Sequence, residues 1–252
     1  MPETSFSIQS LVGYRQRLSA ERIREVSGAM LDGSPLDARI PTSKHADFVY
    51  ESEIGLNELP NHPVIKMSKS EYVDKFFQSG HLQLGTFTYY NAFEHDEIGD
   101  REEGSFLLVG QGKSVTHFNQ VAGGFNKYVL CCYAGEPDPE CVSKFGYDAC
   151  FEITDVRRFT KAIAKSVKAK EFVFANCIYN THKVIVGELF GDYHFPKFLP
   201  RTLEIAGLAK YFVKNAKFSH QREFRFLWSA RSDVYSPLIV RCPQAVEFCR
   251  KR

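Results

Sequence analysis

The sequence predicts an α+β domain, because its strands and helices do not alternate regularly. Hydrophobic patterning indicates about seven or eight short strands and about three or four helices, unevenly interleaved. The chain has 252 residues, of which 44% are hydrophobic and 25% charged, so it can bury a substantial core. It contains no Gly-x-Gly-x-x-Gly, no phosphate-binding Gly-rich Lys motif and no Gly-x-Ser-x-Gly, which disfavours the familiar nucleotide-binding folds.

The composition predicts a cytoplasmic protein with no membrane partner. The N-terminus lacks a basic region followed by an apolar run, and no stretch approaches the length that crosses a bilayer. The seven cysteines include no Cys-x-x-Cys pair, so we expect reduced thiols rather than a structural zinc site. A formal net charge of +2 is too small to indicate a nucleic-acid partner by itself.

Two regions are predicted along the chain. Residues 1–60 are expected to form an N-terminal extension, partly helical, and residues 61–252 a compact domain. Within the extension, an amphipathic pattern favours a helix in Leu11–Leu31. This segment carries no visible chemistry, so we expect it to cover the domain or to bind a partner.

The domain is predicted to begin with a strand, a helix and a second strand. Val64–Met67 is the first strand, and Ser68 with Glu71 three residues later has the pattern of a capping box. Gly80 should end the helix that starts there. His81–Tyr90, rich in threonine and aromatic residues, should form the next strand.

An acidic loop, Glu94–Gly104, follows these elements. Two glycines in a charged run indicate a loop, and its His, Asp and Glu spacing matches no defined calcium or zinc site, so no metal site is assigned. Further strands are predicted at Phe106–Val109, Tyr128–Tyr133, Phe151–Ile153, Phe172–Tyr179, Lys183–Val186 and Ser236–Arg241, and helices after a Thr154 cap and at Leu203–Asn215.

The candidate functional stretch is Lys217–Trp228. A strand from about Phe224 alternates, so Phe224, Phe226 and Trp228 should face a core. Gln221, Glu223 and Arg225 should then share the other face, where an amide and a carboxylate could meet one ligand. The alternative is a half-solvated strand on which Glu223 and its arginine neighbours form a surface charge cluster.

The order of these elements resembles that of the ADP-ribosyltransferase superfamily. The likeness covers Pro63–Arg241 and depends on short motifs. They are Val64-Ile65-Lys66, the strand from Gly85 to Tyr90, the loop with Arg101 and Glu103-Gly104, and the late Gln221-x-Glu223. The resemblance implies two small, packed, mainly antiparallel sheets with flanking helices around an NAD cleft.

The resemblance also implies roles for individual residues. Glu223 matches the family's glutamate that stabilises the oxocarbenium-like transition state as nicotinamide leaves NAD, and Gln221 matches the glutamine that places the acceptor. NAD as co-substrate would be contacted by the residues that match its binding positions. These are Lys66, Tyr89, Tyr90 and Arg101. Tyr89 or Tyr90 could stack on nicotinamide, and Arg101 could meet the pyrophosphate.

The sequence departs from the family's pattern in two places. Lys66 stands where the family has Arg or His, and a lysine lacks the guanidinium fork. The strand Leu130–Tyr133 lacks the hydroxyl cluster often found on the family's middle strand. These departures indicate a divergent branch.

The predicted function is therefore NAD-dependent mono-ADP-ribosyl transfer by a toxin or phage-defence effector, for which an inhibitor or antitoxin protein would be a further partner. The acceptor is a nucleic acid or a protein. Basic residues around the focal stretch, with aromatic residues between them, favour the nucleic acid. They are Lys210, Lys214, Lys217, His220, Arg222, Arg225 and Arg231, with Tyr211, Phe212 and Phe218 between them.

Two alternatives belong to other classes. One is a non-catalytic binding module that retains the fold, which the two departures favour. The other is a nuclease that uses Glu223, His220 and a neighbouring arginine, although the sequence offers no clustered carboxylates for divalent metals.

Overall fold

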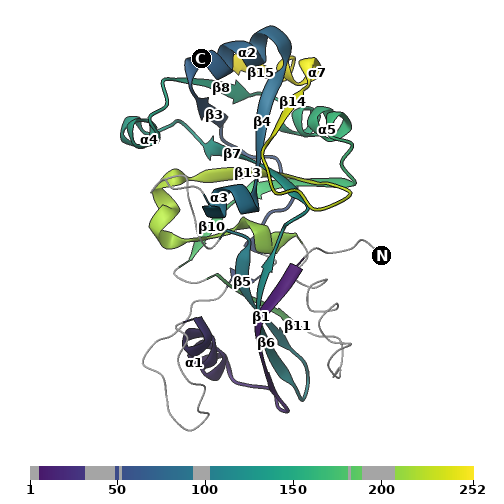
Figure 1. Cartoon of the computed structure of the whole chain (residues 1–252). Coiled ribbons are helices and arrows are strands. Elements are labelled where there is room, and N and C mark those ends of the chain that lie inside the picture. Colours follow the sequence, from purple (N-terminus) through teal and green to yellow (C-terminus); the bar gives the residue numbers. More distant parts are fainter. Residues whose placement is uncertain (1–5, 32–48, 51–52, 93–102, 181–182, 189–207) are drawn as a thin grey trace.

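The computed structural model describes residues 6–31, 49–50, 53–92, 103–180, 183–188 and 208–252 (Figure 1). An eight-stranded sheet forms the upper half of the molecule as drawn. Its strands are β3 (Val64–Ser68), β4 (His81–Thr86), β7 (Lys127–Ala134), β8 (Ala149–Ile153), β9 (Glu171–Asn176), β13 (Glu223–Ser229), β14 (Leu238–Arg241) and β15 (Cys249–Lys251). All strand pairs in this sheet are antiparallel.

A five-stranded mixed sheet forms the lower half. It consists of β1 (Phe6–Tyr14), β2 (Val49–Tyr50), β5 (Ser105–Gln111), β6 (Thr116–Gly123) and β11 (Val184–Glu188), with β11 parallel to both β5 and β2. The short strands β10 (Ile178–Asn180) and β12 (Val213–Asn215) form a separate parallel pair. The predicted α+β class is confirmed.

Helices lie on the outer faces of the two sheets and also between them. They are α1 (Ala20–Leu31), α2 (Ser70–Ser79), α3 (Phe87–Ala92), α4 (Pro139–Phe145), α5 (Val156–Ser166) and α7 (Pro243–Val246), with the 3-10 helices η2 (Ala209–Phe212) and η3 (Ala216–Gln221). None of those in the described part of the chain is both long and apolar enough to cross a bilayer.

Strands β7 and β13 form the centre of the large sheet, and their two faces belong to different cores. Phe224, Phe226 and Trp228 point into one core, beneath α2, α5 and α7, as the alternation predicts. The Trp228 indole N–H donates to the Thr160 carbonyl of α5 at 3.0 Å, which satisfies its polar atom in this apolar setting. The opposite face, including Leu227, packs towards the small sheet.

The two sheets share this second core. Phe87 from α3, Phe106 and Leu108 from β5, and Tyr211 from η2 pack with Leu227 there. The far side of the small sheet is covered by α1, whose buried positions follow a helical repeat. The order of layers is therefore helices, large sheet, small sheet and α1.

Several predicted elements need correction in the N-terminal part. The helix predicted within Leu11–Leu31 is confirmed as α1, which begins at Ala20, whereas the strand β1, which takes residues 11–14 and pairs with β6, was not predicted. The residue that precedes α2 is Lys69 rather than Ser68, and its side chain makes no cap. The Asp148 carboxylate instead accepts from the Ser70 N–H at 2.6 Å. Gly80 ends α2 with φ 72°, as predicted.

Further corrections concern the ends of later elements. The strand expected to reach Tyr90 stops at Thr86, whose hydroxyl accepts from the Tyr89 N–H at 3.1 Å and opens α3. Asp155, not Thr154, caps α5. The helix expected at Leu203–Asn215 is replaced by η2 and β12 in its described part, while residues 203–207 lie outside the described residues.

The packing of Phe226 predicts a large loss of stability on truncation. Its ring is fully buried between Phe224, Trp228 and Phe159. We expect Phe226→Ala to lower the free energy of unfolding by about 3–5 kcal/mol. Urea unfolding followed by circular dichroism measures this loss. Ile239→Ala, at an exposed site on β14, is the control and should cost less than about 0.5 kcal/mol, and equal losses would contradict this view of the core.

Candidate functional site

A cleft opens where the large sheet splits along one edge of β7. That edge pairs with β3 at Ile65–Tyr133 and with β4 at Gly85–Val129, whereas the residues between, 130–132, have no described strand beside them on this edge. The cleft holds about 610 Å³ of empty space, including the part open to solvent. Its lining comprises Lys66, Met67, Tyr90, Glu103, Cys131, Cys132, Tyr133, Phe145, Tyr147, Lys214, Gln221, Glu223 and Arg225.

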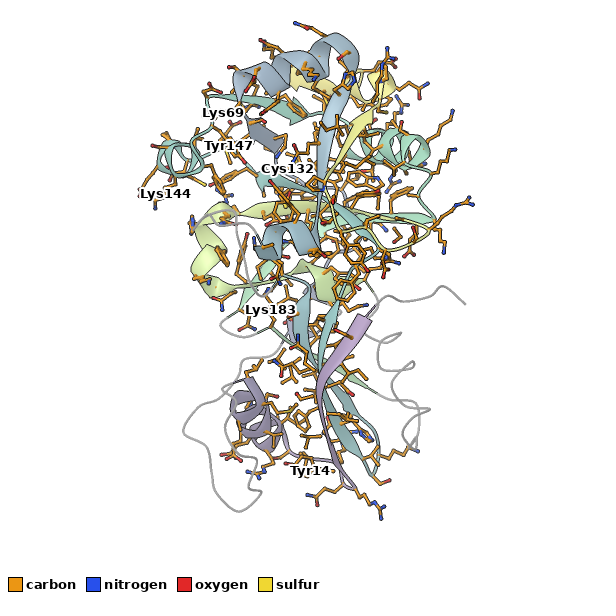
Figure 2. All side chains as sticks on the ribbon, in the orientation of Figure 1. Tyr14, Lys69, Cys132, Lys144, Tyr147 and Lys183 are labelled. Atoms are coloured by element: carbon orange, nitrogen blue, oxygen red, sulfur yellow. The ribbon has the colours of Figure 1, made fainter. Side chains whose placement is uncertain are left out.

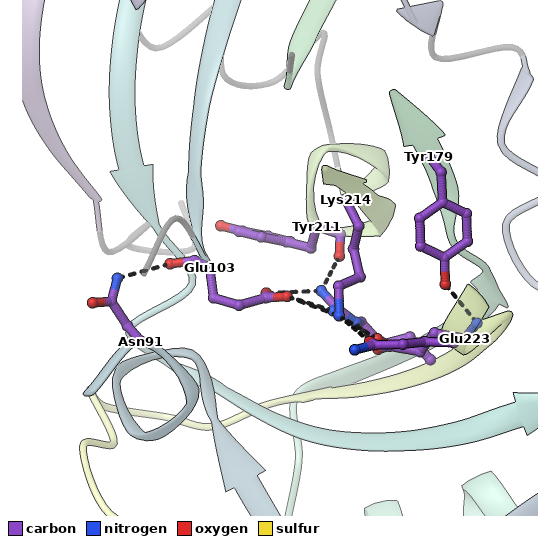
Figure 3. A network of polar contacts seen from close by, with 8 residues as sticks. Asn91, Glu103, Tyr179, Tyr211, Lys214 and Glu223 are labelled. Atoms are coloured by element: carbon purple, nitrogen blue, oxygen red, sulfur yellow. Dashed lines mark hydrogen bonds and ion pairs between the residues drawn. The ribbon is translucent and has the colours of Figure 1, made fainter. Parts of the chain in front are cut away.

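Four buried charged side chains of this lining form a network of polar contacts (Figure 3). Arg225 donates from its two terminal nitrogens to the Glu103 carboxylate at 2.8 and 3.1 Å, a bidentate geometry. Its Nε donates to Glu223 Oε1 at 2.6 Å. Lys214 Nζ donates to Glu223 Oε2 at 2.8 Å and lies 3.6 Å from Glu103 Oε1. We call Glu103, Lys214, Glu223 and Arg225 the charge quartet.

Each member of the charge quartet is at most 7% exposed, and two positive charges balance two negative ones. The members come from different parts of the fold: Glu103 precedes β5 of the small sheet, Lys214 lies in β12, and Glu223 and Arg225 lie in β13. The quartet therefore joins the two sheets at the cleft. Because β13 is buried, the alternative interpretation, in which Glu223 belongs to a surface charge cluster on a half-solvated strand, is wrong.

The pKa values of the charge quartet follow from this pairing. Burial alone would raise the pKa of Glu223, but Arg225 and Lys214 outweigh it and lower that pKa below its ordinary value of 4.5. Burial likewise opposes ionisation of Glu103, yet Arg225 and Lys214 lower its pKa. Burial acts to lower the pKa of Lys214, but Glu223 and Glu103 raise it above its usual range. All three groups are charged at neutral pH.

Gln221 and Glu223 are brought together by a local route that differs from the predicted one. Gln221 is the last residue of η3, and Arg222 has φ 40°, so the chain turns through a left-handed residue before β13 begins. Both side chains still reach the cleft, and Lys214 Nζ links them by also donating to Gln221 Oε1 at 3.0 Å. The Glu223 N–H donates to the Tyr179 hydroxyl at 2.6 Å, which fixes the start of the strand.

Aromatic side chains form the walls of the cleft. Tyr90 lies against Gly85, where a Cβ would be 2.6 Å from the ring, so glycine is required for this placement. Across the cleft, α4 supplies Phe145, which stacks on Tyr147 with ring centroids 5.5 Å apart. Figure 2 shows Tyr147 between α4 and Cys132 of β7. Burial first, and then the neighbouring Cys131 and Glu223, raise the pKa of Tyr90, so its hydroxyl is neutral.

The structure brings together four of the six predicted site residues, Glu223, Gln221, Lys66 and Tyr90. Tyr89 is not among the residues that line the cleft, although its ring centroid lies 5.4 Å from that of Tyr90. Arg101 lies outside the described residues.

Sequence reasoning missed the roles of Glu103, Lys214 and Tyr147. No local pattern marks them, because each reaches the cleft from a separate element. Glu103 was noted only in the loop motif Glu103-Gly104 and Lys214 only in the basic cluster, and neither pattern indicates a buried ion pair.

The prediction of a basic and aromatic surface around η3 is wrong for most of its residues. Lys210, Lys214 and Arg225 are buried, and so are the three aromatic residues between the basic positions, namely Tyr211, Phe212 and Phe218. Lys217, His220, Arg222 and Arg231 remain exposed. Base stacking on those aromatic rings is therefore not available.

No group of three or more His, Cys, Asp or Glu side chains among the described residues is arranged to hold a metal ion. All seven cysteines are free thiols. Burial raises the pKa of Cys132 to about 12, and Cys131 next to Glu223 shifts in the same direction, again first through burial. Both thiols are protonated at neutral pH and are poor nucleophiles.

The lowered pKa of Glu223 predicts acid-sensitive stability. The Glu223 carboxyl group has a pKa near 4.5 in the unfolded chain and a lower pKa in the folded protein. Its contribution to the free energy of unfolding is therefore full above about pH 5.5 and is lost as the pH falls below about 4.5. We expect Glu223→Gln to cost about 3–5 kcal/mol at pH 7 because two buried cations lose a partner. Urea unfolding across pH should show this difference shrinking in acid.

Glu71→Gln, at an exposed position on α2, is the matched control, and we expect it to differ from wild type by less than about 0.5 kcal/mol at every pH. A Glu223→Gln protein as stable as wild type at pH 7 would contradict the balance of charges described here. So would a cost that stays constant into acid.

Comparison with known proteins gives no information on function, so the interpretation of the site depends on the geometry of the cleft. No protein-family model matches the chain, and no curated protein and no solved structure matches it significantly. The resemblance to ADP-ribosyltransferases accordingly stays a prediction from the sequence motifs.

Proposed function

We propose that the protein is an NAD-dependent mono-ADP-ribosyltransferase that uses this cleft. The observation that carries the proposal is the ionised Glu223 carboxylate, fixed beside Gln221 on the floor of a cleft with aromatic walls. A pocket with apolar walls and a few convergent polar groups is the usual form of a small-molecule site. A role as a toxin or phage-defence effector, with an inhibitor protein as partner, is part of the same proposal.

The proposed reaction breaks the bond between ribose C1′ and the nicotinamide nitrogen of NAD. The bonding electron pair leaves with nicotinamide, and positive charge develops on the ribose. The Glu223 carboxylate would stabilise this charge, and the acceptor's nucleophilic atom then bonds to C1′ and loses its proton. Glu223 retains acceptor capacity for the ribose, since a carboxylate has about four lone-pair sites and Arg225, Lys214 and the Cys131 thiol occupy three of them.

The walls of the cleft suit the leaving group. The nicotinamide ring of NAD is planar and positively charged, and aromatic faces attract such cations. Tyr90 and Tyr147 approach the cleft from α3 and from the end of α4. Lys66 supplies a cation for the anionic part of NAD, although it lacks the fork of an arginine.

For the acceptor we propose a nucleic acid or a protein, with Gln221 to orient its nucleophile. Lys217 and Arg222 near Gln221 are exposed, and their positive charges modestly favour an acceptor that carries phosphate groups. The buried members of the basic cluster add nothing to this preference, because they cannot meet an acceptor.

The non-catalytic binding module is kept as a second candidate, on one specific observation. Both Glu223 oxygens already accept from Arg225 and Lys214, and the charge quartet is neutral as a whole. Such a closed set of ion pairs is also what a purely structural role requires. The two candidates differ in one measurable outcome, which is the release of nicotinamide.

We expect the purified protein to release nicotinamide from NAD, and Glu223→Gln to lower that rate by at least about a hundredfold, as loss of a transition-state contact does. Chromatography of the products, with and without RNA, DNA or cell extract, measures release and transfer. Glu171→Gln, which removes an ion-paired carboxylate of β9 outside the cleft, is the control and should keep its rate.

Gln221→Ala removes no charge, so it tests the site without unbalancing the quartet. We expect it to retain NAD cleavage and to lose transfer to the acceptor. Absence of nicotinamide release by the wild-type protein under every condition would reject the transferase and leave the binding module.

A further inference from the structure

We propose that Arg222 and Lys66 form a binding site for a diphosphate group at the mouth of the cleft, beside Tyr133. The site belongs to the cleft of the proposed function, but it needs only that the ligand carry a diphosphate and not that any group be transferred. Arg222 is the variable residue between Gln221 and Glu223 in the motif, and the sequence otherwise assigns it only to the basic cluster that favours a nucleic-acid acceptor.

The first argument is the balance of charge around the cleft. Lys214 and Arg225 are neutralised by Glu103 and Glu223 within the charge quartet. Within the described residues, by contrast, neither Lys66 nor Arg222 forms an ion pair with a carboxylate. Lys66 Nζ donates to the Cys131 carbonyl at 3.2 Å, and the Arg222 guanidinium lies 5.7 Å from the Tyr133 ring centroid. The uncompensated charge at this end of the cleft is positive, which favours an anionic ligand.

The second argument is the position of the two cations. Tyr133 of β7 is paired with Ile65 on one side and with Glu223 on the other. Lys66, on β3, lines the cleft together with Tyr133, and the guanidinium of Arg222, just before β13, lies over the Tyr133 ring. Lys66 bonds to the carbonyl of Cys131 where β3 no longer pairs with β7, which holds its ammonium group at the split in the sheet.

The third argument is the backbone that holds Arg222. Its φ of 40° lies in the left-handed region, in which many helices end, and Arg222 is the residue that ends η3. The facing residue is Gly135, where a Cβ would lie 3.1 Å from Arg222 Nη2. The absent side chain at Gly135 leaves room for the guanidinium over Tyr133, and the exposed guanidinium keeps donors free for a ligand.

These features fit a diphosphate better than an isolated carboxylate or a neutral group. A guanidinium binds two phosphate oxygens with its fork, and an ammonium group binds a further oxygen as a point charge. Two cations from separate segments can each take one phosphate of the pair. The neutral charge quartet behind them does not repel the anion, whereas an unpaired Glu223 would.

Isothermal titration calorimetry with three probes tests the site. Inorganic pyrophosphate tests the anion alone, ADP-ribose tests a nucleoside diphosphate, and adenosine tests a neutral nucleoside. Arg222→Asn removes the cation and keeps a residue type that tolerates the left-handed conformation. We expect it to weaken binding of pyrophosphate and ADP-ribose by about tenfold or more, with adenosine unchanged, and Arg222→Lys to give an intermediate loss.

Lys161→Gln is the control, because it removes an exposed cation of α5 that does not line the cleft. We expect it to change both dissociation constants by less than about twofold. Equal binding by wild type and Arg222→Asn would overturn the proposal, and so would failure of the wild type to bind either diphosphate at millimolar concentration. ADP-ribose binding that depends on Arg222, without pyrophosphate binding, would assign the site to nucleotides rather than to the free anion.

The outcomes also separate this inference from the proposed function. Arg222-dependent binding of a diphosphate by a protein that releases no nicotinamide would sustain the site and reject the transferase. Nicotinamide release with a KM for NAD that is unchanged in Arg222→Asn would sustain the transferase and reject the site.

Discussion

The buried ion pairs of the charge quartet are the interaction on which the cleft depends. Removing a charge from water is costly, and the cost is recovered only when each charge has partners of good geometry. Arg225 meets Glu103 through two hydrogen bonds and Glu223 through a third, and Lys214 closes the set. Because these groups come from both sheets and from β12, forming the quartet also positions the segments that bound the cleft.

The cleft itself exists because one strand cannot pair along its whole edge. On one edge of β7, β3 and β4 take opposite ends, and the polar and aromatic side chains fill the gap between them. On the other edge, β13 pairs with β7 along its full length and carries Glu223 and Arg225. A continuous strand pair thus provides a rigid base, and the split provides access, which is the arrangement a preorganised site requires.

The sequence allowed the apolar half of this architecture to be predicted better than the polar half. Phe224, Phe226 and Trp228 share a core because a two-residue alternation is a local property of a strand. Gln221 and Glu223 were rightly placed together, yet for the wrong reason, since a left-handed Arg222 and not a straight strand joins them. The partner of Arg225 across the two sheets could not be predicted. Glu103 is 122 residues away from Arg225 in the chain, and no spacing rule connects it to β13.

The central claim is that the charge quartet keeps Glu223 ionised inside the cleft. Carbon-13 NMR of the glutamate carboxyl groups during an acid titration tests it directly, with the Glu223 signal assigned by its loss in Glu223→Gln. The account predicts that this signal keeps its carboxylate shift at about pH 4.3, where a glutamate carboxyl group in a model peptide is half protonated. A Glu223 signal that titrates together with the exposed glutamates, or that is already protonated at pH 7, would contradict the account.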